Sequence, residues 1–154
     1  MNALIHAFDG VTALRPGRRA NGIGAPRSLH WAPVTDIDRV YKICSLAAWQ
    51  RALADGEFAP SSDDARDGYI HLSAAEQVRG TLERHFAGQE ALVLLTVVVA
   101  RLPGAGLRWE ASRGGQSFPH LYAPLRVAAV SDCVPLARDA DGRWRLPDAL
   151  ATAR

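Results

Sequence analysis

The sequence contains a single lysine, Lys42, so nearly all of its positive charge is carried by arginine. The 18 basic residues are almost balanced by 16 acidic ones, and the arginines are scattered along the chain. A nucleic-acid-binding surface needs a clustered basic face. Binding to nucleic acid is therefore not expected.

Cysteine is also scarce, with only Cys44 and Cys133 in the chain. Both lie in apolar runs, where a free cysteine is usually a small buried hydrophobe, and two cysteines cannot build a disulfide framework. The longest apolar run, over 91–100, is much shorter than the roughly 18 residues that a membrane span needs. These absences predict a cytoplasmic protein without a membrane span.

The chain has 154 residues, of which 48% are hydrophobic, and this suits one domain with a sizeable core. Residues 1–36 combine arginine, glycine and proline with few acids, so we expect a disordered or flexible extension there. The folded domain is expected over 37–147, followed by a flexible tail over 148–154. Nothing in the sequence indicates an oligomeric state.

Alternating and β-branched runs predict strands, and capping residues followed by glycine predict helices. Ser45 is expected to cap a helix that Gly56 ends, and Ser73 with Glu76 to form the capping box of a second helix. The order of elements predicts an α+β fold, with a small mixed, mostly antiparallel sheet and two short helices. The expected strands cover 39–44, 69–72, 91–99, 107–111 and 126–136, the helices 45–54 and 73–86, a polar loop 58–67 and a hairpin 139–146.

The first segment with unusual polar chemistry is Asp67–Ser73. On a strand, Ile70 and Leu72 face one side and would seek the core, which leaves Tyr69 and His71 together on the other side. The segment runs into a predicted helix N-terminus, whose free N–H groups suit an anionic or phosphate ligand. His71 is therefore a candidate catalytic residue and Tyr69 a candidate for substrate binding.

The second segment is 108–122, where strand alternation places Glu110 beside Arg108 on one face. If the end of the segment is extended, aromatic rings flank an imidazole and form a slot for a flat ring. Glu110 could act as an acid or base, and the arginine of a Gly-Gly turn could hold a phosphate. The alternative is that the charged residues form ordinary ion pairs and the rings ordinary packing. The candidates here are Glu110 and His120 for catalysis, and Arg113, Phe118 and Tyr122 for substrate binding.

The histidines His71, His85 and His120 lack any metal-ligand spacing, so no metal is predicted. His85 lies near the end of a predicted helix, where an imidazole is electrostatically favourable. The sequence contains no Gly-x-Ser-x-Gly elbow, P-loop or Cys-x-x-Cys motif. Nucleophilic hydrolysis through one of these motifs is therefore not expected.

Taken together, several of these motifs resemble the bacterial domain-of-unknown-function family 952, from about Arg39 to Leu136. The resemblance implies a compact domain similar to the ADP-ribosylation fold, and hence NAD as a possible substrate in a nucleotide-binding cleft. The chain departs from that fold's usual pattern because its first strand carries no His or Arg. The motifs are Val40–Ile43, Trp49, Asp67–Ser73 with Glu76-Gln77-Val78, Leu107–Glu110 and Phe118–Leu125.

Three functions stay open at this point. The first is ADP-ribosyl transfer, or a degenerate relative that only binds the ligand, with Tyr41 or Lys42 in place of the first-strand residue. The second is a two-histidine phosphoesterase, because His71 and His120 could serve as acid and base on a cyclic phosphate. This function requires their rings to lie within about 10 Å. The third is a non-catalytic ligand-binding or interaction domain.

Overall fold

The structure is a computed structural model that describes residues 37–112 and 114–151. The predicted N-terminal extension, residues 1–36, lies outside the described residues, as do Arg113 and the last three residues of the chain. The described residues form an α+β fold in which every strand pairing is antiparallel. This confirms the predicted fold class.

The most apolar stretch of the sequence forms β4 (Leu92–Val98), the middle strand of a sheet with the order β1-β4-β8. Its neighbours are β1 (Arg39–Ser45) and β8 (Val130–Pro135). Successive side chains of a strand point to opposite faces, and both faces of β4 are covered. This is why the run is almost continuously apolar rather than alternating.

A second sheet has the order β3-β6-β5, with β3 (Ile70–His71), β6 (Ser117–Leu121) and β5 (Leu107–Ala111). A backbone bridge joins the two sheets, since Tyr41 and Ser73 exchange N–H···O bonds of 2.8 Å. The main core lies between the sheets. Its larger members include Val40, Ile70, Leu72, Val93, Leu95, Val97, Leu121 and Leu125.

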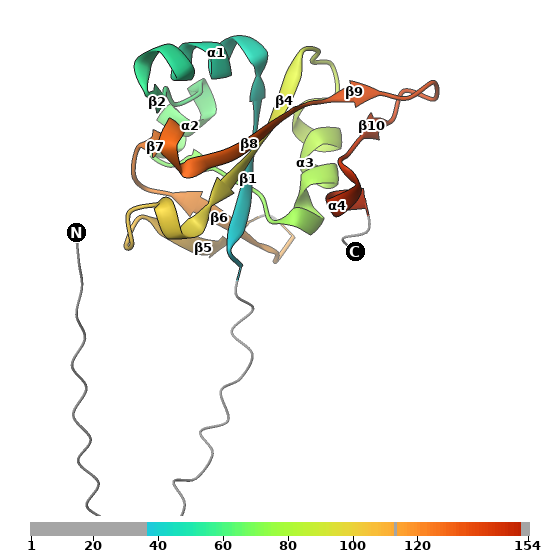
Figure 1. The fold of residues 1–154 in the computed structure, drawn as a ribbon. Coiled ribbons are helices and arrows are strands. Elements are labelled where there is room, and N and C mark those ends of the chain that lie inside the picture. Colours follow the sequence, from blue (N-terminus) through green and yellow to red (C-terminus); the bar gives the residue numbers. More distant parts are fainter. Residues whose placement is uncertain (1–36, 113, 152–154) are drawn as a thin grey trace, which may run out of the picture. The chain divides into compact units, whose positions relative to one another are not determined.

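The other face of the first sheet packs against α3 (Val78–His85) and α4 (Asp148–Ala151) (Figure 1). This second core contains Ile43, Val78, Leu82, Leu92, Leu94, Leu136, Trp144 and Leu150. Helix α1 (Leu46–Asp55) follows β1 directly. As predicted, the Ser45 side chain accepts from the Ala48 N–H at 3.1 Å, and Gly56 ends the helix with φ +79°.

Two short strand pairs complete the described part. β2 (Glu57–Phe58) pairs with β7 (Leu125–Arg126), and β9 (Ala137–Arg138) pairs with β10 (Trp144–Arg145). The second pair confirms the predicted hairpin, which extends away from the sheets in Figure 1. Short 3-10 turns lie at Ala75–Gln77, Val99–Arg101 and Val127–Ala129.

The structure corrects the expected number of helices. The predicted polar loop contains α2 (Ser62–Asp67), which begins at a capping box between Ser61 and Asp64. The predicted tail contains α4, and the expected strand over 126–136 is interrupted by the turn at Val127–Ala129. The spacing of Ser61 and Asp64, which is that of a capping box, is therefore the sequence signal for α2 that the prediction of a loop did not use.

The start of the second predicted helix also differs from expectation. The Gln77 side chain, rather than that of Glu76, caps the backbone there: its oxygen accepts a hydrogen bond from the Ala74 N–H at 3.0 Å. Ser73 is buried and its hydroxyl lies 3.2 Å from that of Thr81. The Ser73–Glu76 capping box is therefore wrong by one residue.

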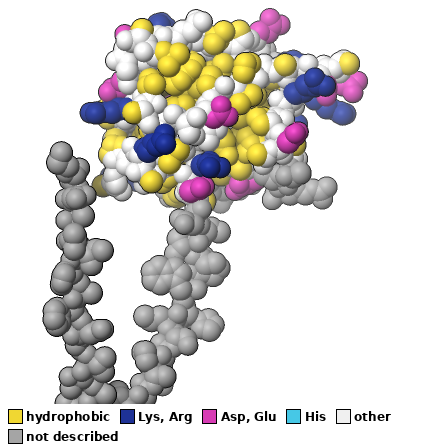
Figure 2. Space-filling view, in the orientation of Figure 1, with side chains coloured by type: hydrophobic (Ala, Val, Ile, Leu, Met, Phe, Trp, Pro, Cys, Tyr) yellow, Lys and Arg dark blue, Asp and Glu magenta, His cyan; other side chains and the backbone are white. Residues whose placement is uncertain are grey.

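The surface in Figure 2 mixes hydrophobic and uncharged side chains with scattered arginines and acids. Within 37–112 and 114–151, no helix is long and apolar enough to cross a membrane.

Candidate functional site

The polar face of the second sheet carries the candidate site. In the antiparallel register, His71 of β3 lies opposite His120 of β6, and His120 lies opposite Arg108 of β5. Directly opposed residues project from the same face of a sheet. The sheet therefore brings two imidazoles and a guanidinium into one row from segments far apart in the chain.

Strand alternation separates this face from the core. Ile70 and Leu121 are buried in the main core, as predicted for Ile70. Tyr69 and Tyr122 flank the histidines on the polar face, and Phe118 lies on the same face at the other end of β6, opposite Glu110. The predicted grouping of aromatic rings around imidazoles is thus present.

The rings of these residues are in contact. Tyr69 stacks on His120 with a centroid distance of 4.0 Å and an interplanar angle of 18°. The Tyr69 centroid is 4.7 Å from that of His71 and 5.2 Å from that of Tyr122. The two imidazole centroids are 5.6 Å apart, which meets the distance required for a histidine pair.

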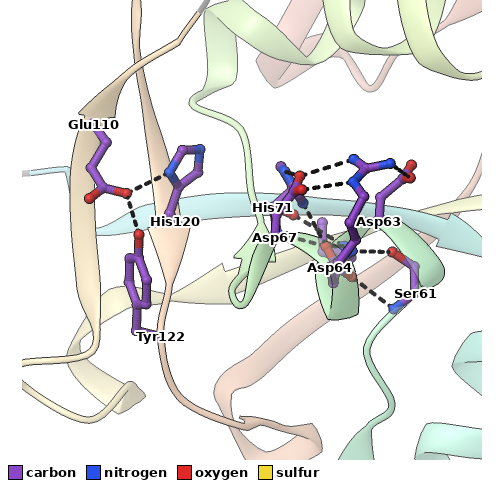
Figure 3. A network of polar contacts seen from close by, with 10 residues as sticks. Ser61, Asp63, Asp64, Asp67, His71, Glu110, His120 and Tyr122 are labelled. Carbon is purple, nitrogen blue, oxygen red and sulfur yellow. Dashed lines mark hydrogen bonds and ion pairs between the residues drawn. The ribbon is translucent and has the colours of Figure 1, made fainter.

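Glu110 holds His120 in place. Its Oε2 lies 2.8 Å from His120 Nδ1 and also accepts from the Tyr122 hydroxyl at 2.8 Å (Figure 3). The hydrogen bonds from His120 and Tyr122 hold the pKa of Glu110 below its ordinary value. The same bond raises the pKa of Tyr122, because ionisation would set two negative oxygens against each other. Glu110 is therefore a carboxylate that orients His120.

His71 has a carboxylate at each ring nitrogen. Its Nδ1 lies 2.8 Å from Asp64 Oδ1 and its Nε2 lies 3.2 Å from Asp67 Oδ2. The backbone N–H of His71 also donates to Asp64 Oδ1 at 2.9 Å. The His71 side chain is 39% exposed, whereas that of His120 is 8% exposed and lies beneath Tyr69. His71 is thus the more accessible imidazole.

Asp64 connects His71 to the only lysine. Lys42 Nζ donates to the Asp64 carboxylate at 3.0 and 3.3 Å and to the His71 carbonyl at 3.2 Å. Burial alone would raise the pKa of Asp64, but the hydrogen bonds from His71 and the Lys42 charge outweigh it and hold that pKa well below its ordinary range. Both partners are buried, with side chains only 6% and 1% exposed. The pair is a fixed internal support for His71.

Sequence reasoning offered Lys42 only as an alternative to Tyr41 on the first strand, and it did not place Asp64 or Asp67 among the site residues. The available signal for Lys42 was its position between Val40 and Cys44, two core residues on the same face of β1. A charged group that replaces a core residue must be paired. The signal for Asp64 was the Ser61-x-x-Asp spacing of a capping box, which places that carboxylate at a helix N-terminus.

The structure does not bring Tyr41 to this site. Because alternate residues of β1 face opposite sides, Tyr41 packs against the second core, and it lines a separate hollow that contains Arg39 and Thr96. Its neighbour Lys42 is the first-strand residue that reaches the site. Arg113 lies outside the described residues, so its predicted role is not assigned a position.

Arg108 provides the exposed positive charge of the row. Its guanidinium lies over the Tyr122 ring, 4.5 Å from the centroid. This arrangement leaves its N–H groups at the face that carries the histidines. Among the described residues, no group of three or more His, Cys, Asp or Glu side chains is arranged to hold a metal ion. The histidines of this face can transfer protons, and Arg108 can bind an anion.

Comparisons with known proteins show which family and which solved structures the chain resembles. The family described as "Protein of unknown function (DUF952)" matches residues 43–133. The crystal structure of protein CC0527 from Caulobacter crescentus is similar, with 51% identity and a TM-score of 0.68, over 73% of this chain and 98% of that chain. The solution NMR structure of CC0527 gives 51% identity and a TM-score of 0.65, over 74% and 97% of the two chains. No protein of curated function matches the chain.

Proposed function

This chain belongs to the DUF952 family, and we propose that it is an enzyme that performs general acid–base chemistry on a small phosphodiester, such as a cyclic nucleotide. One observation carries the proposal: the imidazoles of His71 and His120 lie 5.6 Å apart, each with Nδ1 at 2.8 Å from a carboxylate. A carboxylate at Nδ1 fixes the tautomer, which leaves Nε2 of His120 for chemistry, while Nε2 of His71 faces Asp67 at 3.2 Å. Two imidazoles prepared in this way form an acid and a base.

The surroundings assign different roles to the two rings. Nδ1 of His71 donates to Asp64, and its Nε2 faces Asp67 favourably only while it also carries a proton. Nε2 of His120 has no hydrogen-bond partner within the described part of the chain, so its lone pair can accept a proton. His71 is therefore the proposed acid and His120 the proposed base.

The proposed step hydrolyses the diester. His120 Nε2 takes a proton from water as the water oxygen attacks phosphorus. The phosphorus–oxygen ester bond breaks, and the leaving oxygen receives the proton from His71 Nε2. The phosphate charge would lie near the exposed guanidinium of Arg108, which shares the row with both histidines.

The Tyr69 ring stacks on His120 and restricts access to this proposed catalytic base. Because His120 is only 8% exposed, little of the imidazole is open to a bulky substrate. The site therefore favours a small diester over a nucleic-acid chain, which agrees with the scattered charge of the sequence.

The proposal is tested by incubating the protein with 2′,3′-cyclic nucleotides and following the conversion of diester to monoester by ³¹P NMR. We expect His71→Ala and His120→Ala each to lower the rate about 100-fold or more, because general acid–base groups contribute about 10²–10⁴-fold. His85→Ala is the matched control, since His85 is exposed at the end of α3. Wild-type protein that hydrolyses no diester, or histidine variants at full rate, would refute the proposal.

ADP-ribosyl transfer from NAD is a second candidate, suggested by the family resemblance and favoured by the Tyr69–Tyr122 ring pair, which suits a flat ring. It receives less support from the geometry, because Glu110 is already bonded to His120 and Tyr122, and Lys42 to Asp64. Titration calorimetry with NAD, NADP and ADP-ribose tests it. The absence of binding at millimolar concentration would eliminate this candidate.

A further inference from the structure

A hollow of about 330 Å³ lies beside the histidine pair, between β2, α2 and the chain that follows β6. This volume is at the lower end of the range for small-molecule sites, about 300–1,000 Å³. Most of its wall is apolar or aromatic. The principal wall residues are Phe58, Pro60, Ala65, Tyr69, Tyr122 and Pro124.

Two tyrosines join this hollow to the histidines. Tyr69 lines the hollow and also stacks on His120 at 4.0 Å. Tyr69 and Tyr122 each lie two residues along the strand from a histidine of the pair, and the Tyr69 ring centroid is only 4.7 Å from that of His71. One small molecule is therefore long enough to contact both the tyrosines and the histidines.

The charge of the wall limits what the hollow can accept. Its only charged side chains within the described chain are Glu57 and Asp64, and Asp64 is already paired with the buried Lys42. The described wall therefore offers no cationic side chain to a phosphate, whereas Arg108 supplies a guanidinium in the row that carries both histidines. The hollow thus suits the uncharged part of a ligand, and the histidine row suits the anionic part.

We propose that the hollow binds the base of a nucleotide whose phosphate lies at His71 and His120. The position of the phosphate rests on the proposed function. The position of the nucleotide base rests on the hollow alone. The rings of Tyr69 and Tyr122, tilted by 50° with centroids 5.2 Å apart, supply the aromatic surface against which a flat heterocycle packs. The substrate class is then a nucleoside cyclic phosphate rather than a sugar or lipid phosphodiester.

The test uses adenosine, which has the base but no phosphate, titrated into the full chain and followed by amide NMR shifts. We expect shifts at Gly68 and Ala123, which line the hollow. Ala65→Leu fills the hollow from the exposed side of α2 and is expected to weaken adenosine binding at least tenfold. Ala47→Leu, an equal change at an exposed position of α1, is expected to leave binding unchanged.

No shift with adenosine at millimolar concentration, or equal binding by the Ala65→Leu variant, would overturn the proposal. Measuring cyclic nucleotide hydrolysis as well as adenosine binding separates a failure of the hollow from a failure of the histidine chemistry. Hydrolysis that is insensitive to Ala65→Leu would reject the hollow and retain the histidine chemistry. Adenosine binding at Gly68 and Ala123 without any hydrolysis would retain the hollow and reject the proposed function.

Discussion

At the scale of single residues, Asp64 supports the site through four kinds of contact. Its carboxylate accepts hydrogen bonds from Lys42 Nζ, from the His71 ring, and from the backbone N–H groups of His71 and Ser61. Removing one partner of a buried ion pair leaves the other charge uncompensated. The Lys42 ammonium therefore depends on Asp64 for its place in the core.

We expect Asp64→Asn to lower the free energy of unfolding by about 3 kcal/mol, because it leaves Lys42 buried without a counter-charge. Urea denaturation measures this change. Asp63→Asn is the matched control, since Asp63 is 69% exposed and pairs with the exposed Arg66; such pairs contribute about 1 kcal/mol or less. Equal effects of the two variants would show that the buried pair does not stabilise the fold.

The same carboxylate predicts a dependence of stability on pH. Because folding lowers the pKa of Asp64, its contribution is fully present above the ordinary aspartate pKa of about 3.9 and is lost as pH falls toward the lower folded value. The gap in free energy of unfolding between wild type and Asp64→Asn should therefore be constant near neutral pH and shrink below about pH 4. A gap that grows as the solution is acidified would contradict the direction of the shift.

At the scale of elements, α2 and its end at Gly68 position the first histidine. Gly68 has φ +80° and its N–H donates to the Asp64 carbonyl at 2.9 Å, which turns the chain into β3. This left-handed conformation is costly for residues with a Cβ. The turn is what allows the Asp64 carboxylate and the His71 ring to meet.

We expect Gly68→Ala to destabilise the protein by about 1 kcal/mol and Gly80→Ala to stabilise it by about 1 kcal/mol. Gly80 lies inside α3, and a Cβ there would meet no atom within 4 Å. Thermal unfolding of both variants measures the contrast. Stabilisation by both substitutions would mean that the backbone at Gly68 is free to leave its left-handed conformation.

Much of the site was predictable from local patterns. Period-two alternation predicted that Tyr69 and His71 share a face, and residue types placed Glu110, His120 and Tyr122 in one candidate segment. The pairing of β3 with β6 was not predictable, because it depends on contacts between distant segments. The burial of Lys42 against Asp64 and the helix α2 were missed, because an isolated charge in a strand and a six-residue helix give weak periodic signals.

At the scale of the whole molecule, the site exists because two sheets share one core. The bridge between Tyr41 and Ser73 sets β1 beside the end of β3, so Lys42 enters the space beneath His71. The pairing of β3 with β6 then adds His120 and the residues that hold it. A histidine pair, its carboxylates and a buried lysine are thus assembled by the fold rather than by any local motif.

The central claim is that the Glu110 carboxylate fixes the His120 ring so that its Nε2 is left for chemistry, and long-range ¹H–¹⁵N NMR of the histidine rings tests it most directly. We expect neutral His120 to carry its proton on Nδ1 in the wild-type protein, and Glu110→Gln to weaken this preference, while exposed His85 is the same in both proteins. A wild-type His120 protonated at Nε2 would contradict the claim, because Nδ1 could not then donate to Glu110 and Nε2 could not accept a proton.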